Sequence, residues 1–122
     1  MPSLHDHHTQ AKSNLQFMET VSSQFPDWAI TSRYYAAVHL VRACLASRGA
    51  YATNTHMDVR ELLERTGFDR KVLLEYRILE SLSRTARYEC RPFAVLQPNV
   101  LEAQKLLEVL EAYILPRIQA QL

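Results

Sequence analysis

The chain has 122 residues, a formal net charge of +1, and only two glycines and five prolines. This length is typical of one domain with a substantial core, so we expect residues 1–122 to form a single domain. The scarcity of glycine and of β-branched runs, together with many Ala, Leu, Glu and Arg residues, favours an all-helical protein. The nearly neutral charge excludes an overall field that attracts nucleic acid, so any basic surface must be local.

Neither a membrane segment nor a disulfide framework is indicated. No apolar run approaches the roughly 18 to 20 residues of a membrane span, and no secretory leader precedes the first helix. The two cysteines, Cys44 and Cys90, both fall inside expected helices and read as reduced, buried small hydrophobes. We therefore expect a cytoplasmic protein that makes no membrane contact.

The first expected helix covers about residues 3–24. Ser3 followed by Asp6 resembles a capping pair, and Pro26 ends the helix. Its polar residues leave one apolar face, which predicts packing on one side only. This face consists of Ala11, Leu15, Met18, Val21 and Phe25.

The second expected helix, about residues 26–48, is the centre of the fold. Pro26 and Asp27 open it, and Gly49 ends it. Apolar residues cover most of its circumference, so several neighbours must bury it. One remaining stripe carries large side chains with hydrogen-bonding ends, which predicts a surface that faces a second subunit or a ligand. The stripe consists of Trp28, Ser32, Tyr35, His39 and Arg42.

Three further helices are expected. Thr55 and Asp58 cap a short helix that ends near Arg65, with Val59, Leu62 and Leu63 buried. A long helix begins after Asp69 and ends near Cys90; its core stripe runs from Val72 to Cys90, flanked by Leu73, Leu74, Ile78 and Leu82. Asn99 and Glu102 cap the last helix, which Pro116 kinks or ends. Tight loops between these elements predict an all-α, antiparallel up-and-down bundle of four long helices plus one short helix.

The central helix carries the first candidate site. Tyr35 and His39 are four residues apart and therefore neighbours on one face, and Arg42 lies about one turn further. Arg33 and His39 are six residues apart, which places them roughly 120° and 9 Å from each other on an ideal helix. In a functional interpretation His39 is a general acid or base and an arginine holds a phosphate. In the alternative interpretation, which we favour, His39 is a buried histidine hydrogen-bonded to a tyrosine or to the backbone within the bundle.

An arginine-rich face on the long helix is the second candidate. The seven-residue spacing of its arginines keeps them on one side of the helix, with Arg87 and Glu80 beside them. This face either follows a phosphate backbone or is solvated, with Glu80 offsetting Arg84. The repeating residues are Arg70, Arg77, Arg84 and Arg91.

The remaining histidines predict no metal site. His5, Asp6, His7 and His8 are possible ligands at a helix start, but a tight site needs ligands from separate elements, so a mobile polar terminus is the favoured interpretation. His56 stands alone near the start of the short helix. No glycine-rich phosphate loop, nucleophile arrangement or paired-cysteine zinc motif is present. We expect neither a metal nor a cofactor.

The ordered set of motifs resembles a HEPN domain over about residues 8–115, and most closely the small stand-alone members with an S-R-x-Y-Y-A signature. The similarity rests on the runs WAITSRYYAAVHLVRACLASRG, THMDVRELL and LEYRILESLSRTARYE. The residues that stand in the expected order are Ser32, Arg33, Tyr34, Tyr35, Ala36, His39, His56 and the segment 84–88.

The resemblance implies a helical bundle that dimerises through its central helices. Many HEPN proteins are metal-independent endoribonucleases or toxins paired with a nucleotidyltransferase-type antitoxin, and others bind nucleotides or RNA without cleavage. Catalytic members carry an arginine followed after four to six residues by a histidine on the penultimate long helix. Here residues 84–91 contain no histidine, and only Arg33 and His39 meet this spacing, on the central helix. These two are the catalytic candidates by chemistry rather than by aligned position.

Three functions follow as hypotheses. The leading one is an RNA- or nucleotide-binding homodimer that belongs to a toxin–antitoxin or defence system and pairs with a nucleotidyltransferase-type protein. The second is a metal-independent endoribonuclease toxin that uses His39 with Arg33 or another arginine. The third is a non-catalytic bundle that docks another protein. The candidate ligand-binding residues are Tyr35, Arg42, His56, Arg84, Arg87 and Tyr88.

Overall fold

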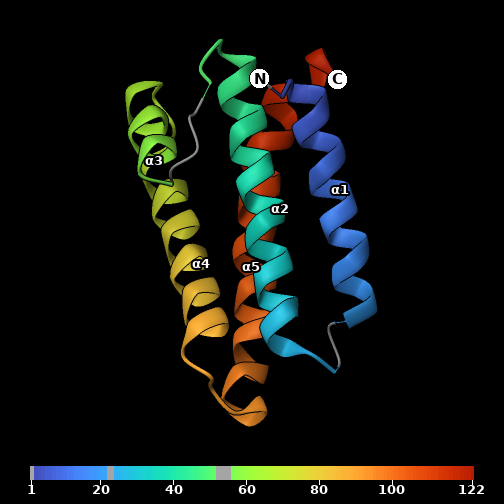
Figure 1. Ribbon diagram of the computed structural model, residues 1–122. Helices are drawn as coiled ribbons and strands as arrows, with labels where there is room; N and C mark the ends of the chain where they lie inside the picture. Colours follow the sequence, from blue (N-terminus) through green and yellow to red (C-terminus); the bar gives the residue numbers. More distant parts are fainter. Residues whose placement is uncertain (1, 22–23, 52–55) are drawn as a thin grey trace.

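The computed structural model describes residues 2–21, 24–51 and 56–122. Within these ranges the chain forms α-helices and no strand, which confirms the expected all-α bundle (Figure 1). The helices α1 and α4 run opposite to α2 and α5, with α1 and α4 on either side of the α2–α5 pair (Figure 1). The elements are α1 (Leu4–Val21), α2 (Pro26–Ser47), α3 (His56–Arg65), α4 (Arg70–Tyr88), α5 (Phe93–Ile118) and a 3₁₀ turn (Gln119–Gln121).

The helix α1 begins with the predicted capping pair and packs mainly on α2. The backbone N–H of Ser3 donates to Asp6 at 2.9 Å, and the N–H of Asp6 donates to the Ser3 hydroxyl at 3.1 Å. Two amide groups that have no partner inside the helix are thus satisfied. Leu4, Ala11 and Met18 are buried against the rest of the bundle. Phe25, predicted to extend this face, instead lies beyond α1 and is half exposed.

The helix α2 is the predicted central helix. Pro26 stands in its first turn, where its missing N–H costs no hydrogen bond. Gly49 follows the helix with φ +75°, a conformation that a side chain disfavours. Its apolar residues, including Ile30, Tyr34 and Val41, are fully buried by α1, α4 and α5. In its polar stripe Ser32 is buried, His39 and Arg42 are half-buried, and Trp28 and Tyr35 are exposed.

The start of α4 is stabilised by a cap of its own and by a hydrogen bond to α5. Gly67 has φ +77° in the turn after α3, and the Asp69 carboxylate accepts a hydrogen bond from the backbone N–H of Val72 at 3.0 Å. The backbone N–H of Asp69 donates to the Tyr113 hydroxyl of α5 at 3.1 Å. The expected Thr55–Asp58 cap lies outside the described residues.

The helix α5 begins seven residues earlier than the sequence pattern predicted, because its cap is Pro92 rather than Asn99. Its first residue is Phe93, and the carbonyl of Pro92 accepts from Val95 and Leu96. Pro98 therefore lies inside the helix, near its start, rather than ahead of it. Burial of Leu96 on the same face as Val100 compensates for the hydrogen bond that the proline removes. Pro116 does not end the helix either, because α5 continues to Ile118.

Three other expectations about α4 were wrong. Cys90 is exposed and lies outside the helix with φ +49°, because α4 ends at Tyr88. Leu74 and Ile78 are 56% and 45% exposed, since they lie outside the side of α4 that packs on α2 and α5. Glu80 does not offset Arg84 on a solvated face, because its side chain is buried.

The Glu80 carboxylate belongs to a buried polar group that joins α2, α3 and α4. It accepts a hydrogen bond from the Tyr34 hydroxyl at 3.1 Å and lies 3.9 Å from the Arg60 guanidinium of α3. The ring of Tyr34 stacks on that of Tyr76 with centroids 6.1 Å apart. Burial raises the pKa of both tyrosines, so both hydroxyls stay protonated.

Within the described residues, none of the helices is long and apolar enough to cross a membrane.

Candidate functional site: a cleft between α1 and α2

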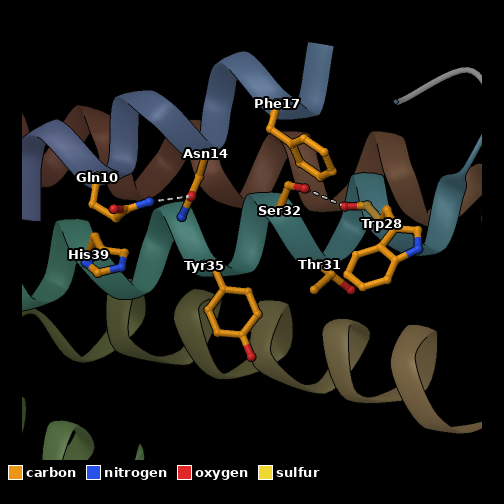
Figure 2. A pocket seen from close by; sticks show the side chains of 8 residues that line it. All are labelled: Gln10, Asn14, Phe17, Trp28, Thr31, Ser32, Tyr35 and His39. Carbon is orange, nitrogen blue, oxygen red and sulfur yellow. Dashed lines mark hydrogen bonds between the residues drawn. The ribbon is translucent and has the colours of Figure 1, made fainter. Parts of the chain in front are cut away.

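A cleft of about 330 Å³ lies along the seam between α1 and α2 (Figure 2). Its residues come from both helices, and four of the five residues of the polar stripe on α2 line it. Because α1 packs mainly on α2, the position of α1 decides the width of the cleft. The lining residues are Gln10, Asn14, Phe17, Trp28, Thr31, Ser32, Tyr35 and His39.

Aromatic side chains form much of the wall. Phe17 is 50% exposed, Trp28 53% and Tyr35 37%, which is unusual for side chains of this size on one face. Phe17 and Trp28 lie at one end, and Tyr35 lies further along α2, between Thr31 and His39 (Figure 2). Exposed rings lining a cleft provide flat apolar faces on which a planar ligand can stack.

Amide groups lie along the α1 side of the cleft. The Gln10 side-chain amide donates to the Asn14 carbonyl at 3.0 Å, and the Asn14 amide nitrogen points toward α2 (Figure 2). The hydroxyls of Thr31 and Ser32 on the opposite side donate to the carbonyls of Asp27 and Trp28 at 2.7 and 2.6 Å. The hydroxyls are thus engaged by the helix backbone, whereas the α1 amides offer a donor and an acceptor to a ligand.

A histidine pair closes the end of the cleft toward the C-terminus of α2. The Nδ1 atom of His39 lies 2.8 Å from the Nδ1 atom of His7 on α1, and their ring centroids are 5.1 Å apart. Burial lowers the pKa of His39 to about 4, and repulsion from a protonated His7 and from Arg42 acts in the same direction. Burial also lowers the pKa of His7, with Arg42 acting in the same direction and Asp6 against it. His39 is therefore a neutral imidazole at pH 7.

An arginine of α4 binds the outer edge of Tyr35. The guanidinium of Arg87 donates to the Tyr35 hydroxyl at 2.9 Å. Its carbon lies 5.5 Å from the centre of the Tyr35 ring and 5.0 Å from that of Tyr88, within the range of cation–π attraction. The Nε of Arg87 also donates to the carbonyl of Ser83 at 3.4 Å, so two of the five N–H groups of this guanidinium are engaged in these hydrogen bonds. The structure thus brings together three predicted binding residues, Tyr35, Arg87 and Tyr88.

Other predicted residues lie elsewhere. Arg33 is buried and faces α5, where its Nε donates to Gln104 at 2.8 Å and its Nη1 to the carbonyl of Ala29 at 3.0 Å. Its side chain and that of His39 therefore face different helices, as their angular offset indicated. Arg42 is half-buried beside the histidine pair, and Arg84 is exposed on α4. His56 begins α3, but its side chain lies outside what the structure describes.

Sequence reasoning missed the contribution of α1. His7 was assigned to a mobile terminus, yet it is 7% exposed and bonded to His39. The signal was present, because His7 continues the apolar stripe of Ala11 by one turn and lies three residues after Leu4. Gln10, Asn14 and Phe17 repeat at four and three residues along the edge of the same stripe, which is the spacing of a helix flank.

The family model for the HEPN domain matches residues 5–115. The chain therefore belongs to the HEPN family, as the motifs of α2 and α4 indicated. The match spans α1 through most of α5, so it includes both walls of the cleft. No curated protein matches the chain.

Proposed function

We propose that this HEPN protein binds RNA or a nucleotide in the cleft between α1 and α2. The observation that carries the proposal is the grouping of three exposed aromatic rings with side-chain amides and an arginine. Unpaired bases stack on aromatic rings and use their edges to bond amides such as those of Asn and Gln. An arginine at the rim supplies the charge for phosphate.

The distribution of charge also favours a ligand whose base lies inside the cleft and whose phosphate lies at the edge of the cleft. His39 is neutral and accepts or donates a hydrogen bond without adding charge to the cleft. The cationic groups, Arg87 and Arg42, lie at its edges. A base thus occupies an uncharged aromatic cleft, and the phosphate lies outside it beside a guanidinium. The net charge of +1 agrees with recognition through this local arrangement rather than through a general attraction.

The nuclease alternative rests on the same cleft but requires another arginine. A neutral His39 can act as a general base, whereas Arg33 is bonded to Gln104 and Ala29 and turned toward α5. Within one chain, a phosphate clamp near His39 would come from Arg42 or Arg87. The homodimer and the nucleotidyltransferase-type partner remain predictions, which light scattering and co-purification test.

Fluorescence anisotropy with a labelled single-stranded RNA, at low salt and with EDTA, tests the proposal. We expect saturable binding that Tyr35→Ala weakens by about 1–3 kcal/mol, the value of one stacked base. Tyr51→Ala is the matched control, because Tyr51 is 48% exposed and does not line the cleft. Electrophoresis of the same RNA after incubation shows whether it is cleaved and whether His39→Ala prevents cleavage. Absence of binding to both RNA and mononucleotides would contradict the proposal.

A further inference from the structure

Two smaller hollows continue the cleft toward α4 and the start of α5. The second, of about 230 Å³, shares Trp28 and Thr31 with the cleft and is also lined by Asp27, Ala86 and Arg87. The third, of about 220 Å³, shares Asp27 and Ala86 with the second. Its other lining residues are Gln24, Pro26, Cys90, Arg91, Phe93 and Leu96. The three hollows therefore adjoin one another, with Trp28 at the first junction.

The size and lining of the hollows fit one unstacked base or its sugar–phosphate at each position. Each volume lies near or below the lower end of the range for drug-sized ligands, about 300–1,000 Å³. The walls alternate between aromatic and cationic groups: Trp28 at the first junction, Arg87 in the second hollow, and Arg91 with the half-exposed Phe93 in the third. Rings alternating with guanidinium groups form a surface that binds a single strand, because rings bind the bases and arginines the phosphates.

We infer that the ligand is a single-stranded oligonucleotide of about three nucleotides that runs from the α1–α2 cleft over Trp28 to Arg91. This inference rests on the proposed function and distinguishes a strand from a mononucleotide. A duplex does not fit the same contacts, since its base faces are already stacked. The path crosses one unfavourable charge, because Asp27 lines the second and third hollows. Arg91 is bonded to Glu89 at 2.9 Å, but exposed ion pairs of this kind stabilise little and exchange readily with phosphate.

Trp28 gives a direct readout, because it is the only tryptophan of the chain and is 53% exposed. Tryptophan fluorescence is titrated with AMP, then with oligoadenylates of two, three, four and six residues, in EDTA. We expect affinity to rise roughly 5- to 150-fold per added base up to about three and then to level off. Equal affinity for AMP and the hexamer would overturn the inference and leave the proposed function intact. Absence of binding by every ligand, in fluorescence and in anisotropy, would remove both.

Variants locate the strand along the path. Arg91→Ala should weaken the trimer at least severalfold and leave AMP unchanged, whereas the matched control Arg70→Ala, at the other end of α4, should affect neither. Asp27→Asn should strengthen the trimer by removing repulsion. Unchanged affinity of the Arg91→Ala variant for the trimer would contradict the inference that the strand reaches Arg91. Equal affinity for a deoxyribose trimer would support the proposed path, because the contacts to bases and phosphates need no 2′-hydroxyl. Tighter binding of a complementary duplex would contradict the proposed single-stranded ligand.

Discussion

The Nδ1 atoms of His7 and His39 lie 2.8 Å apart across the seam between α1 and α2. At this distance one nitrogen donates and the other accepts, so the pair shares one proton between the two Nδ1 atoms. Protonation of one ring places a cation in this partly buried site beside Arg42, and protonation of both rings puts an N–H on each Nδ1 atom, so that the hydrogen bond is lost and two cations face each other. The contact between α1 and the centre of the bundle thus depends on the pair remaining neutral.

Stability should therefore fall as the pH falls through the range in which histidine is ordinarily protonated. The pKa of His39 is about 4 in the folded chain, against 6.5 for an ordinary histidine, and that of His7 is lowered too. Between these values the unfolded chain binds more protons than the folded chain, so the free energy of unfolding decreases from about pH 6.5 to about pH 4 and then levels off. Urea unfolding at several pH values measures this decrease.

The double variant His7→Gln, His39→Gln is the control for the pH experiment. It keeps every carboxylate and the three other histidines, so it reports the acid dependence of the rest of the chain. We expect a shallower fall in its free energy of unfolding across the same window. Parallel curves for the two proteins would show that the histidine pair does not couple protonation to the packing of α1.

The adjacent tyrosines of α2 should respond differently to loss of the hydroxyl. Tyr34→Phe removes the buried hydrogen bond to Glu80 and should lower the free energy of unfolding by about 1.5–3 kcal/mol, as for bonds to charged groups. Tyr35→Phe removes a hydroxyl that bonds Arg87 at the surface and should cost less than about 0.5 kcal/mol. Chemical denaturation of both variants checks this. Equal effects would contradict the division between a core residue and a cleft residue.

Arg87 should contribute to RNA affinity through phosphate. Arg87→Ala should weaken binding at low salt and reduce the slope of log K against log salt by about 1, as expected for one phosphate contact. Arg77→Ala is the matched control, because Arg77 is exposed on the same helix but does not line the hollows. Binding titrations at several salt concentrations measure both slopes. A similar loss of slope in the two variants would assign Arg87 only a general electrostatic role.

The two cysteines should differ in reactivity. Cys90 is exposed after the end of α4, whereas Cys44 is buried in α2 and its burial raises the pKa of its thiol. We expect a thiol reagent to modify one cysteine quickly in the folded chain and the second only after unfolding. Cys90→Ser should abolish the fast phase. Two fast thiols in the native chain would contradict the packing of α2.

The sequence predicted the fold well because its strongest signals are local. Proline and glycine positions placed both ends of α2, and the caps at Ser3 and Asp69 were confirmed. The start of α5 was missed because Pro98 and Asn99 are strong helix-start signals, whereas the helix begins at Phe93 and buries Leu96 ahead of them. Propensity describes the isolated segment, whereas packing decides the final boundary.

The site could be predicted only in part, because it depends on contacts between distant segments. The polar stripe on α2 was visible as spacing, and its side chains do line the cleft. The partners of these side chains come from α1 and α4, and no local pattern states that His7 bonds His39 or that Arg87 bonds Tyr35. The orientation of Arg33 could not be predicted from local spacing either, since it depends on a hydrogen bond to Gln104, 71 positions away in the sequence.

The central claim is that the cleft between α1 and α2 is the binding site. Amide and side-chain resonances of the labelled protein, followed by two-dimensional NMR during titration with a short single-stranded RNA, test it most directly. We predict that the largest shifts fall on Gln10, Asn14, Phe17, the indole N–H of Trp28 and Tyr35, while Arg65 and Arg117 remain unchanged. Saturable shifts confined to the outer faces of α4 and α5, or no shifts at all, would contradict the claim.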